Sequence, residues 1–140
     1  MAYPEDMVAP MRAEVAGLGV TELRTAESAR TAMALPAGTA LYFVNSVCGC
    51  AAGSARPGLA ASLASPVRPD RLYTVFAGND VEAVAEVRSR ILGYPPSSPC
   101  FALFKDGELV SMIERHQIQG LSASEVGAKL AGLYAEHCAS

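Results

Sequence analysis

The sequence has no apolar run approaching the roughly 20 residues that cross a bilayer, although 51% of its 140 residues are hydrophobic. Its first residues include Glu5 and Asp6, where a secretion signal would carry Lys or Arg. The net charge of −3 is spread without long blocks of one sign, which argues against a nucleic-acid-binding surface. These absences predict a cytoplasmic protein that binds neither membranes nor nucleic acids.

Cysteine is also scarce, and its spacing excludes two of its common uses. Of the four cysteines, only Cys48 and Cys50 are close together, so the chain lacks the pair of Cys-x-x-Cys motifs of a zinc knuckle. A chain of this length can bury a core without disulfides, and the cytosol would keep its thiols reduced. There are no repeats, linkers or low-complexity tracts. Residues 1–140 are therefore predicted to form one domain.

What is present is an alternation of helix and strand patterns. Thr25 and Asp80 are suitable helix caps, and residues 39–46, apolar in their middle, predict a strand buried on both faces. Asp106-Gly107 can supply the positive φ angles of a hairpin turn. The predicted helices are 4 to 17 or 19, 25 to about 35, 50 to about 64, 80 to about 91, and 122 or 124 to about 136. The predicted strands are 21–24, 39–46, 72–76, 100–104 and 109–114.

Prolines mark the ends and irregularities of these elements. Pro36 and Gly38 are expected to close the second helix after Leu35. Pro57 falls inside the third helix, where the missing N–H predicts a kink. The segment 95–99, reading PPSSP, makes an irregular approach to the strand at 100–104.

Strands separated by helices require a parallel arrangement, and the final hairpin adds an antiparallel edge. This succession resembles the thioredoxin fold with one extra helix in front: a three-layer α/β/α sandwich around a mixed sheet. In thioredoxin-like proteins the redox cysteines follow the second strand, as Cys48 and Cys50 do here. A cis-proline begins the strand before the final hairpin in such proteins. The resemblance therefore implies that Pro99 is cis and faces Cys48.

The Cys48-Gly49-Cys50 motif lies on the predicted turn from a strand to a helix. Free N–H groups at a helix N-terminus stabilise a thiolate, which predicts a depressed pKa for Cys48 but not for Cys50. A disulfide across only one intervening residue would be strained and easily reduced. The alternatives are a pair of small buried side chains, or copper or zinc binding with His116, His137 or Cys138.

Three segments resemble the bacilliredoxins. They are residues 44–57, which contain VNSVCGCAAG and Ala-Arg-Pro; residues 93–99, GYPPSSP; and residues 114–118, ERHQI, with Gly120. Bacilliredoxins are small bacterial proteins of the thioredoxin fold that remove bacillithiol, a low-molecular-weight thiol, from bacillithiolated proteins. Members are also described as weak disulfide isomerases. The resemblance implies that Cys48 attacks the mixed disulfide, that Cys50 resolves it or backs it up, and that bacillithiol is the co-substrate.

Four further residues have less specific interpretations. Arg56 could pair with an anionic thiol cofactor or be solvated on its helix. His116 could assist proton transfer or contact a ligand, or be a half-exposed loop histidine. Cys100, next to Pro99, is interpreted as an inert core thiol rather than a third redox thiol. Cys138 is either an exposed regulatory thiol or untethered. The predicted partners are client proteins with mixed disulfides and a partner reductase.

Overall fold

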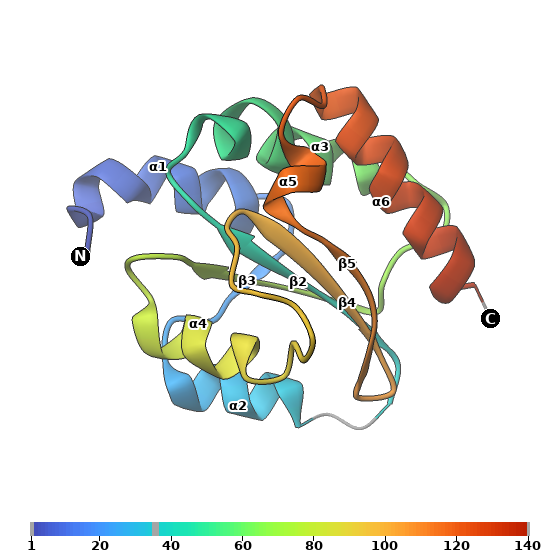
Figure 1. Ribbon diagram of the computed structural model, residues 1–140, viewed down its shortest axis with the longest axis horizontal. Coiled ribbons are helices and arrows are strands. Elements are labelled where there is room, and N and C mark those ends of the chain that lie inside the picture. Colours follow the sequence, from blue (N-terminus) through green and yellow to red (C-terminus); the bar gives the residue numbers. More distant parts are fainter. Residues whose placement is uncertain (1, 35–36, 140) are drawn as a thin grey trace.

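The computed structural model describes residues 2–34 and 37–139. Five strands form one mixed sheet in the order β1-β3-β2-β4-β5 (Figure 1). Strands β1, β3 and β2 run parallel, whereas β4 is antiparallel to β2 and to β5. The strands are β1 (Thr21–Glu22), β2 (Thr39–Asn45), β3 (Arg71–Phe76), β4 (Cys100–Lys105) and β5 (Glu108–Ile113). The helical elements are α1 (Glu5–Ala16), α2 (Ala26–Met33), the π-helical turn η1 (Ala51–Ala55), α3 (Arg56–Ser62), α4 (Val81–Arg88), α5 (Arg115–Ile118) and α6 (Ala123–His137).

Helices cover both faces of the sheet, which gives the predicted three layers. Helices α1, α3 and α6 lie on one face, and α2 and α4 lie on the other (Figure 1). Every residue of the central strand β2 is buried, and its alternate side chains enter two cores. Leu41 and Phe43 join the core under α3 and α6, while Tyr42 and Val44 join the core under α2 and α4. The predicted strand buried on both faces is thus confirmed.

Helices α3 and α6 approach closely because glycines lie at their crossing. A Cβ added at Gly58 would come within 2.6 Å of the Cβ of Val126. A Cβ added at Gly127 would come within 2.9 Å of the Cβ of Ala61. The contact holds η1 and α3, which follow directly after the cysteine pair, against the rest of the fold.

We therefore expect Gly58→Ala to destabilise the protein. Forcing a methyl group into this contact should cost about 1–3 kcal/mol of unfolding free energy, the usual range for overpacking. Gly132→Ala is the matched control, since no atom of the described structure lies within 4 Å of its added Cβ. That variant should be neutral or more stable by up to about 1 kcal/mol, because Ala favours helix over Gly. Urea unfolding of both variants checks this, and equal stabilities would contradict the packing account.

The structure corrects several predicted boundaries. The helix predicted from 50 to about 64 is divided into η1 and α3, ends at Ser62, and has Pro57 in the first turn of α3. Since Pro57 has no N–H to donate to the preceding turn, the wider π-helical turn precedes it. The strand predicted at 21–24 is limited to β1. The short helix α5 was not predicted. The predicted closure at Leu35 and Pro36 lies outside the described residues.

Asp80 precedes α4 as predicted, but its side chain does not cap the helix. Its carboxylate accepts hydrogen bonds from Arg12 on α1, at 2.8 and 2.9 Å, and from the backbone N–H of Phe76. Both charged side chains of this pair are buried. Because a buried carboxylate needs a cation and hydrogen-bond donors, the contact with Arg12 takes the place of the cap and fixes α1 to the sheet.

The turn between β4 and β5 follows the prediction. Asp106 and Gly107 have φ angles of 52° and 83°, the left-handed values that a tight hairpin turn requires. Within residues 2–34 and 37–139, no helix combines the length and the apolar composition that a membrane span needs.

Candidate active site

The two neighbouring cysteines lie in the turn that leaves the end of β2. Strand β2 ends at Asn45, and the chain then enters η1 through the cysteine pair. The carbonyl of Cys48 accepts hydrogen bonds from the backbone N–H groups of Ala51 and Ala52, at 3.1 and 3.2 Å. Both cysteine side chains are partly exposed and unbridged. They are therefore accessible at the beginning of a helical segment, as predicted.

The sulfur of Cys48 receives hydrogen bonds from several directions. The Cys50 Sγ lies 2.9 Å from it, and the Ser46 hydroxyl donates to it over 3.2 Å. Ser46 in turn accepts a hydrogen bond from the Cys48 backbone N–H, at 3.3 Å. When Cys48 is a thiolate, Cys50 must be the donor of the sulfur–sulfur contact, because a thiolate has no proton.

These contacts separate the pKa values of the two thiols. Burial disfavours the thiolate of Cys48, but hydrogen bonds from Cys50 and Ser46 outweigh it and hold the pKa of Cys48 below its ordinary value. The backbone N–H of Ala51 and the charge of Arg115 act in the same direction. Burial raises the pKa of Cys50, as do its hydrogen bond to Cys48 and the negative charge there. The predicted difference between the two thiols agrees in direction with this structure.

A buried arginine, Arg56, forms hydrogen bonds with the residues that precede the cysteine pair. Arg56 is only 3% exposed, and its Nη1 donates to the Ser46 carbonyl at 2.8 Å and to the Asn45 side chain at 3.0 Å. Its Nε donates to Glu14 on α1, at 2.9 Å. The Asn45 amide donates to the Met11 carbonyl, also on α1. The backbone before Cys48 is thus connected to α1 by one network.

The position of Arg56 therefore differs from both interpretations of the sequence, which were pairing with an anionic cofactor and solvation on its helix. It is not solvated, and its described donors are directed to the protein interior rather than to an anionic cofactor. The physical reason is that α1 covers this side of the turn and supplies Glu14 as a counter-charge.

Pro99 directly precedes β4, the strand that neighbours β2. The Ser98–Pro99 peptide bond is cis, as predicted. Cys100, the first residue of β4, pairs with Val44 near the end of β2, which brings Pro99 to the same end of the sheet as the turn that contains the cysteines. Arg115 is attached to the same loop, because its Nη1 donates to the Ser98 carbonyl at 3.2 Å. The charge of Arg115 also acts on both thiols.

The remaining candidates lie in different surroundings. His116 is exposed on α5, next to Arg115. Cys100 is 2% exposed in the core under α2 and α4, and burial raises its pKa to about 11. It matches the description of an inert core thiol. Cys138 is half-buried at the end of α6, where burial raises its pKa against a hydrogen bond with Thr39. It is partly exposed, and its backbone N–H donates to the Tyr134 carbonyl, which corrects the interpretation as an untethered residue; a regulatory role for this thiol stays a prediction.

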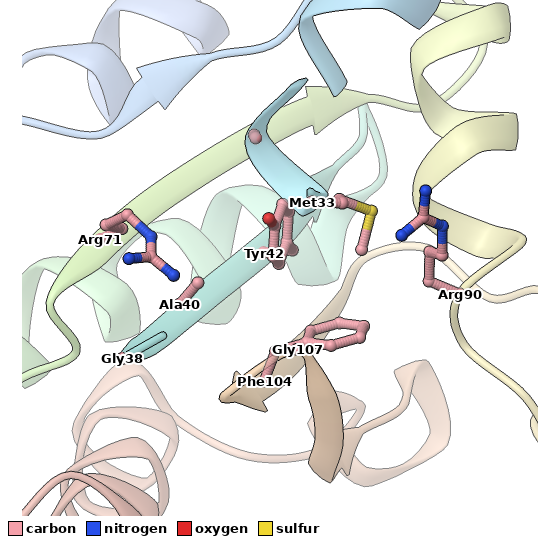
Figure 2. Close-up of a pocket in the computed structure, with 9 residues that line it drawn as sticks. Met33, Gly38, Ala40, Tyr42, Arg71, Arg90, Phe104 and Gly107 are labelled. Atoms are coloured by element: carbon pink, nitrogen blue, oxygen red, sulfur yellow. The ribbon is translucent and has the colours of Figure 1, made fainter. Parts of the chain in front are cut away.

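Among the described residues, no three or more His, Cys, Asp or Glu side chains gather where they could hold a metal ion. A cavity of about 20 Å³ lies on the face of α2, where Arg71 and Arg90 flank Tyr42 (Figure 2). It has room for about one water molecule, and neither cysteine of the pair lines it.

Comparison with known proteins decides the family. A family model described as "Disulphide isomerase" matches residues 3–138. The chain is 53% identical over 134 residues to a bacilliredoxin of Cytophaga hutchinsonii, covering 96% of this chain and 98% of the relative. The chain belongs to the bacilliredoxin family. A bacilliredoxin of Bacillus thuringiensis is 49% identical over 97% of this chain and 94% of its own length.

Solved structures show the fold of this bacilliredoxin-family chain. Mitochondrial thioredoxin 3 of Saccharomyces cerevisiae matches with a TM-score of 0.54 and 18% identity, over 84% of this chain and 95% of its own. A thioredoxin of Plasmodium falciparum has the same TM-score, with 17% identity over 84% and 98% of the two chains. The predicted thioredoxin-like fold is confirmed. Family and fold together make the protein a thiol–disulfide oxidoreductase.

Two residues at the site were missed by the sequence reasoning. Ser46 and Arg115 both lie within the segments that carry the resemblance to bacilliredoxins. The spacing of Ser46 two residues before Cys48 is a signal that could have been used, because serine hydroxyls commonly bond the backbone two residues on. No comparable local signal exists for Arg115, which reaches the Ser98 carbonyl across 17 residues of sequence.

We expect the two thiols to become reactive in a fixed order as the pH rises. A thiol is alkylated as its thiolate, which is the minor form below the pKa. Cys48 should therefore react with iodoacetamide at a lower pH than Cys50. Cys100 should react only near pH 11 or on unfolding. Ser46→Ala removes a donor to the thiolate and should move the Cys48 midpoint upward. Ser54→Ala is the matched control, since its hydroxyl bonds the Leu121 carbonyl instead. Superimposed profiles for Cys48 and Cys50 would contradict the site description.

Proposed function

We propose that this protein removes bacillithiol from mixed disulfides on client proteins, with Cys48 as the attacking thiol. The observation that carries the proposal is the partly exposed Cys48 sulfur, which Ser46 and Cys50 stabilise as a thiolate. Membership of the bacilliredoxin family supports bacillithiol as the adduct. The reaction needs a compartment in which thiols are kept reduced, so we place it in the cytoplasm.

In the first step the Cys48 thiolate attacks the bacillithiol sulfur of the mixed disulfide. A bond forms between Cys48 Sγ and that sulfur, the disulfide to the client breaks, and its electron pair leaves on the client sulfur. The client thiolate then takes a proton from solvent. No net oxidation occurs, because one disulfide is exchanged for another. Pro99, at the same end of the sheet as the cysteine pair, is proposed to contact the client segment.

In the second step the adduct must leave Cys48. Cys50 can attack Cys48 Sγ, which releases the bacillithiol thiolate and forms a Cys48–Cys50 disulfide. A disulfide across a single glycine closes a small ring and is easily reduced. Two electrons from an external low-molecular-weight thiol or a partner reductase then restore both thiols. The external thiol can also attack the mixed disulfide on Cys48 directly, so Cys50 is not strictly required for release of the adduct.

The same chemistry allows a weak disulfide isomerase activity. The description of the matching family model favours this second activity. An isomerase attacks a client disulfide, lets the freed client thiol attack elsewhere and departs without net oxidation. A mixed disulfide between Cys48 and the client that breaks easily suits that role. Recovery of activity by a client with scrambled disulfides, in the presence of the protein but not of Cys48→Ala, tests it.

The principal proposal is tested with a client protein that carries bacillithiol on one cysteine. The reduced protein should lower the client mass by that of the adduct, and a variant lacking both thiols, Cys48→Ser with Cys50→Ser, should not. The same client carrying glutathione measures the preference for bacillithiol. Loss of both adducts at equal rates would support a general disulfide reductase instead, and loss of neither would refute the proposal.

A further inference from the structure

Arg115 is an exposed cation beside the thiol pair, and its position is fixed by contacts to the loop of Pro99. Its side chain donates to the Ser98 carbonyl over 3.2 Å, and its backbone N–H donates to the Ser97 hydroxyl over 3.4 Å. A guanidinium has five N–H donors. Among the described residues, the Ser98 carbonyl is the only acceptor found for this side chain. Most of its donors therefore remain available to a ligand.

The nearest acidic side chain in the sequence does not neutralise Arg115. The contacts of Glu114 with α5 are made by its backbone: its carbonyl accepts from the Gln117 N–H, and its N–H donates to the Gln117 side chain. Within residues 2–34 and 37–139, no carboxylate forms a salt bridge with Arg115. This contrasts with Arg12 and Arg56, which are buried and paired with acidic residues. Of Arg12, Arg56 and Arg115, only Arg115 exposes its charged group to solvent.

The position of Arg115 relative to the thiols follows from its contact with the loop before β4. Cys100, the first residue of β4, pairs with Val44 near the end of β2, so the loop that contains Ser98 and the turn that contains Cys48 lie at the same end of the sheet. Arg115 is attached to Ser98, so it lies on the β4 side of the cysteine pair. Its charge favours the thiolate form at both sulfurs, which agrees with this placement.

We propose that Arg115 is a specificity-determining residue that binds a carboxylate of the thiol adduct as it is transferred to Cys48. The inference rests on the proposed function and names the contact by which an anionic thiol is selected. Guanidinium groups bind carboxylates through charge-assisted and often paired hydrogen bonds. Arg115 takes the role that was one of two interpretations of Arg56, whose described donors are directed inward. An acidic client segment is the competing source of a carboxylate, and the experiment separates the two.

The test uses one client protein whose single cysteine carries, in turn, 3-mercaptopropionate, 2-mercaptoethanol or cysteamine. These adducts are similar in size and bear a negative charge, no charge and a positive charge. For each adduct, the single-turnover transfer rate of the wild-type protein is divided by that of Arg115→Gln. This ratio cancels the intrinsic reactivity of the adduct and any contribution from an acidic client segment, because the client is the same throughout.

The ratio should be about fivefold larger for the carboxylate adduct than for the neutral one, the size expected for one solvent-exposed ion pair. For cysteamine it should be smaller than for the neutral adduct. Arg115→Lys should retain part of the preference. Arg88→Gln is the matched control, since Arg88 donates to the Ser97 carbonyl of the same loop and its charge acts on Cys100. This variant should leave the preference for the carboxylate adduct unchanged.

Equal ratios for the three adducts would overturn the inference, because they would mean that Arg115 acts only on the thiols or on the client. The same loss of preference in Arg88→Gln would also overturn it, by assigning the effect to the loop as a whole. If the wild-type protein did not remove bacillithiol from the same client, the proposed function would be refuted instead. The two failures are therefore distinguishable.

Discussion

Replacing Cys48 by alanine should reduce transfer of the thiol adduct to the background rate, whereas replacing Cys50 should preserve a single turnover. Attack needs one thiolate, and Cys48 is the thiol whose ionised form is stabilised. Cys50 also donates to that thiolate over 2.9 Å, so Cys50→Ala should raise the pKa of Cys48 and slow the transfer. A hydrogen bond to a charged group is worth about 1.5–3 kcal/mol, but a thiolate of higher pKa is a stronger nucleophile and recovers about half of this, so the decrease should be about tenfold.

Cys50→Ser is the matched control for this effect, because its hydroxyl can still donate to the Cys48 sulfur. It should transfer faster than Cys50→Ala at neutral pH. Both variants should accumulate the mixed disulfide on Cys48 until an external thiol is added. An inactive Cys50→Ala together with an active Cys48→Ala would reverse the two roles. Full activity in both would mean that the thiol pair is not the active site.

The second large effect is expected on stability, at Arg56. Arg56→Gln removes the donors of the Ser46 carbonyl and of the Asn45 side chain, and leaves these buried acceptors with fewer partners. The Asn45 oxygen keeps the Ser46 backbone N–H as a donor, so we expect a loss of about 1–3 kcal/mol of unfolding free energy, the cost of one buried group, the Ser46 carbonyl, that loses its partner. Arg56→Lys should recover little of it, because one ammonium group cannot reproduce the spread donors of a guanidinium.

Glu14→Gln is the control for the charged part of this network. The Glu14 side chain is 44% exposed, and glutamine keeps an acceptor for Arg56, so the loss should stay below about 1 kcal/mol. Urea unfolding of the reduced proteins measures both changes. If Arg56→Gln were as stable as the wild-type protein, Arg56 would not be the support of the active-site turn.

The fold could be predicted from the sequence because its main signals are local. The apolar run at 39–46, the Asp106-Gly107 turn and the order of strands and helices each act over a few residues. The cis form of Pro99 came from resemblance to thioredoxin-like proteins. The division of the third helix did not follow from Pro57 alone, because a proline within a helix is compatible with a kink, a break or a wider turn.

The site could be predicted only where one residue type carries the chemistry. The cysteine pair is recognisable from its spacing. The direction of its pKa difference could be predicted from the strand-to-helix turn, although the structure assigns that difference mainly to the hydrogen bonds of Cys48 with Cys50 and Ser46. The surroundings depend on contacts between residues far apart in sequence. Arg56 reaches Glu14 across 42 residues, and Arg12 reaches Asp80 across 68. Whether an arginine is solvated, pairs with a ligand or supports a turn depends on which helix covers it, and the spacing of residues does not contain that information.

The central claim, that Cys48 takes the adduct from the client, is tested most directly by mass spectrometry. The reduced protein is mixed with a client carrying bacillithiol, quenched with acid during the first turnover and digested under non-reducing conditions. The peptide that contains Cys48 and Cys50 should gain the adduct mass as the client loses it, and fragmentation should assign it to Cys48. Adduct mass found first on Cys50, Cys100 or Cys138, or client adduct lost without any mass appearing on this protein, would contradict the account.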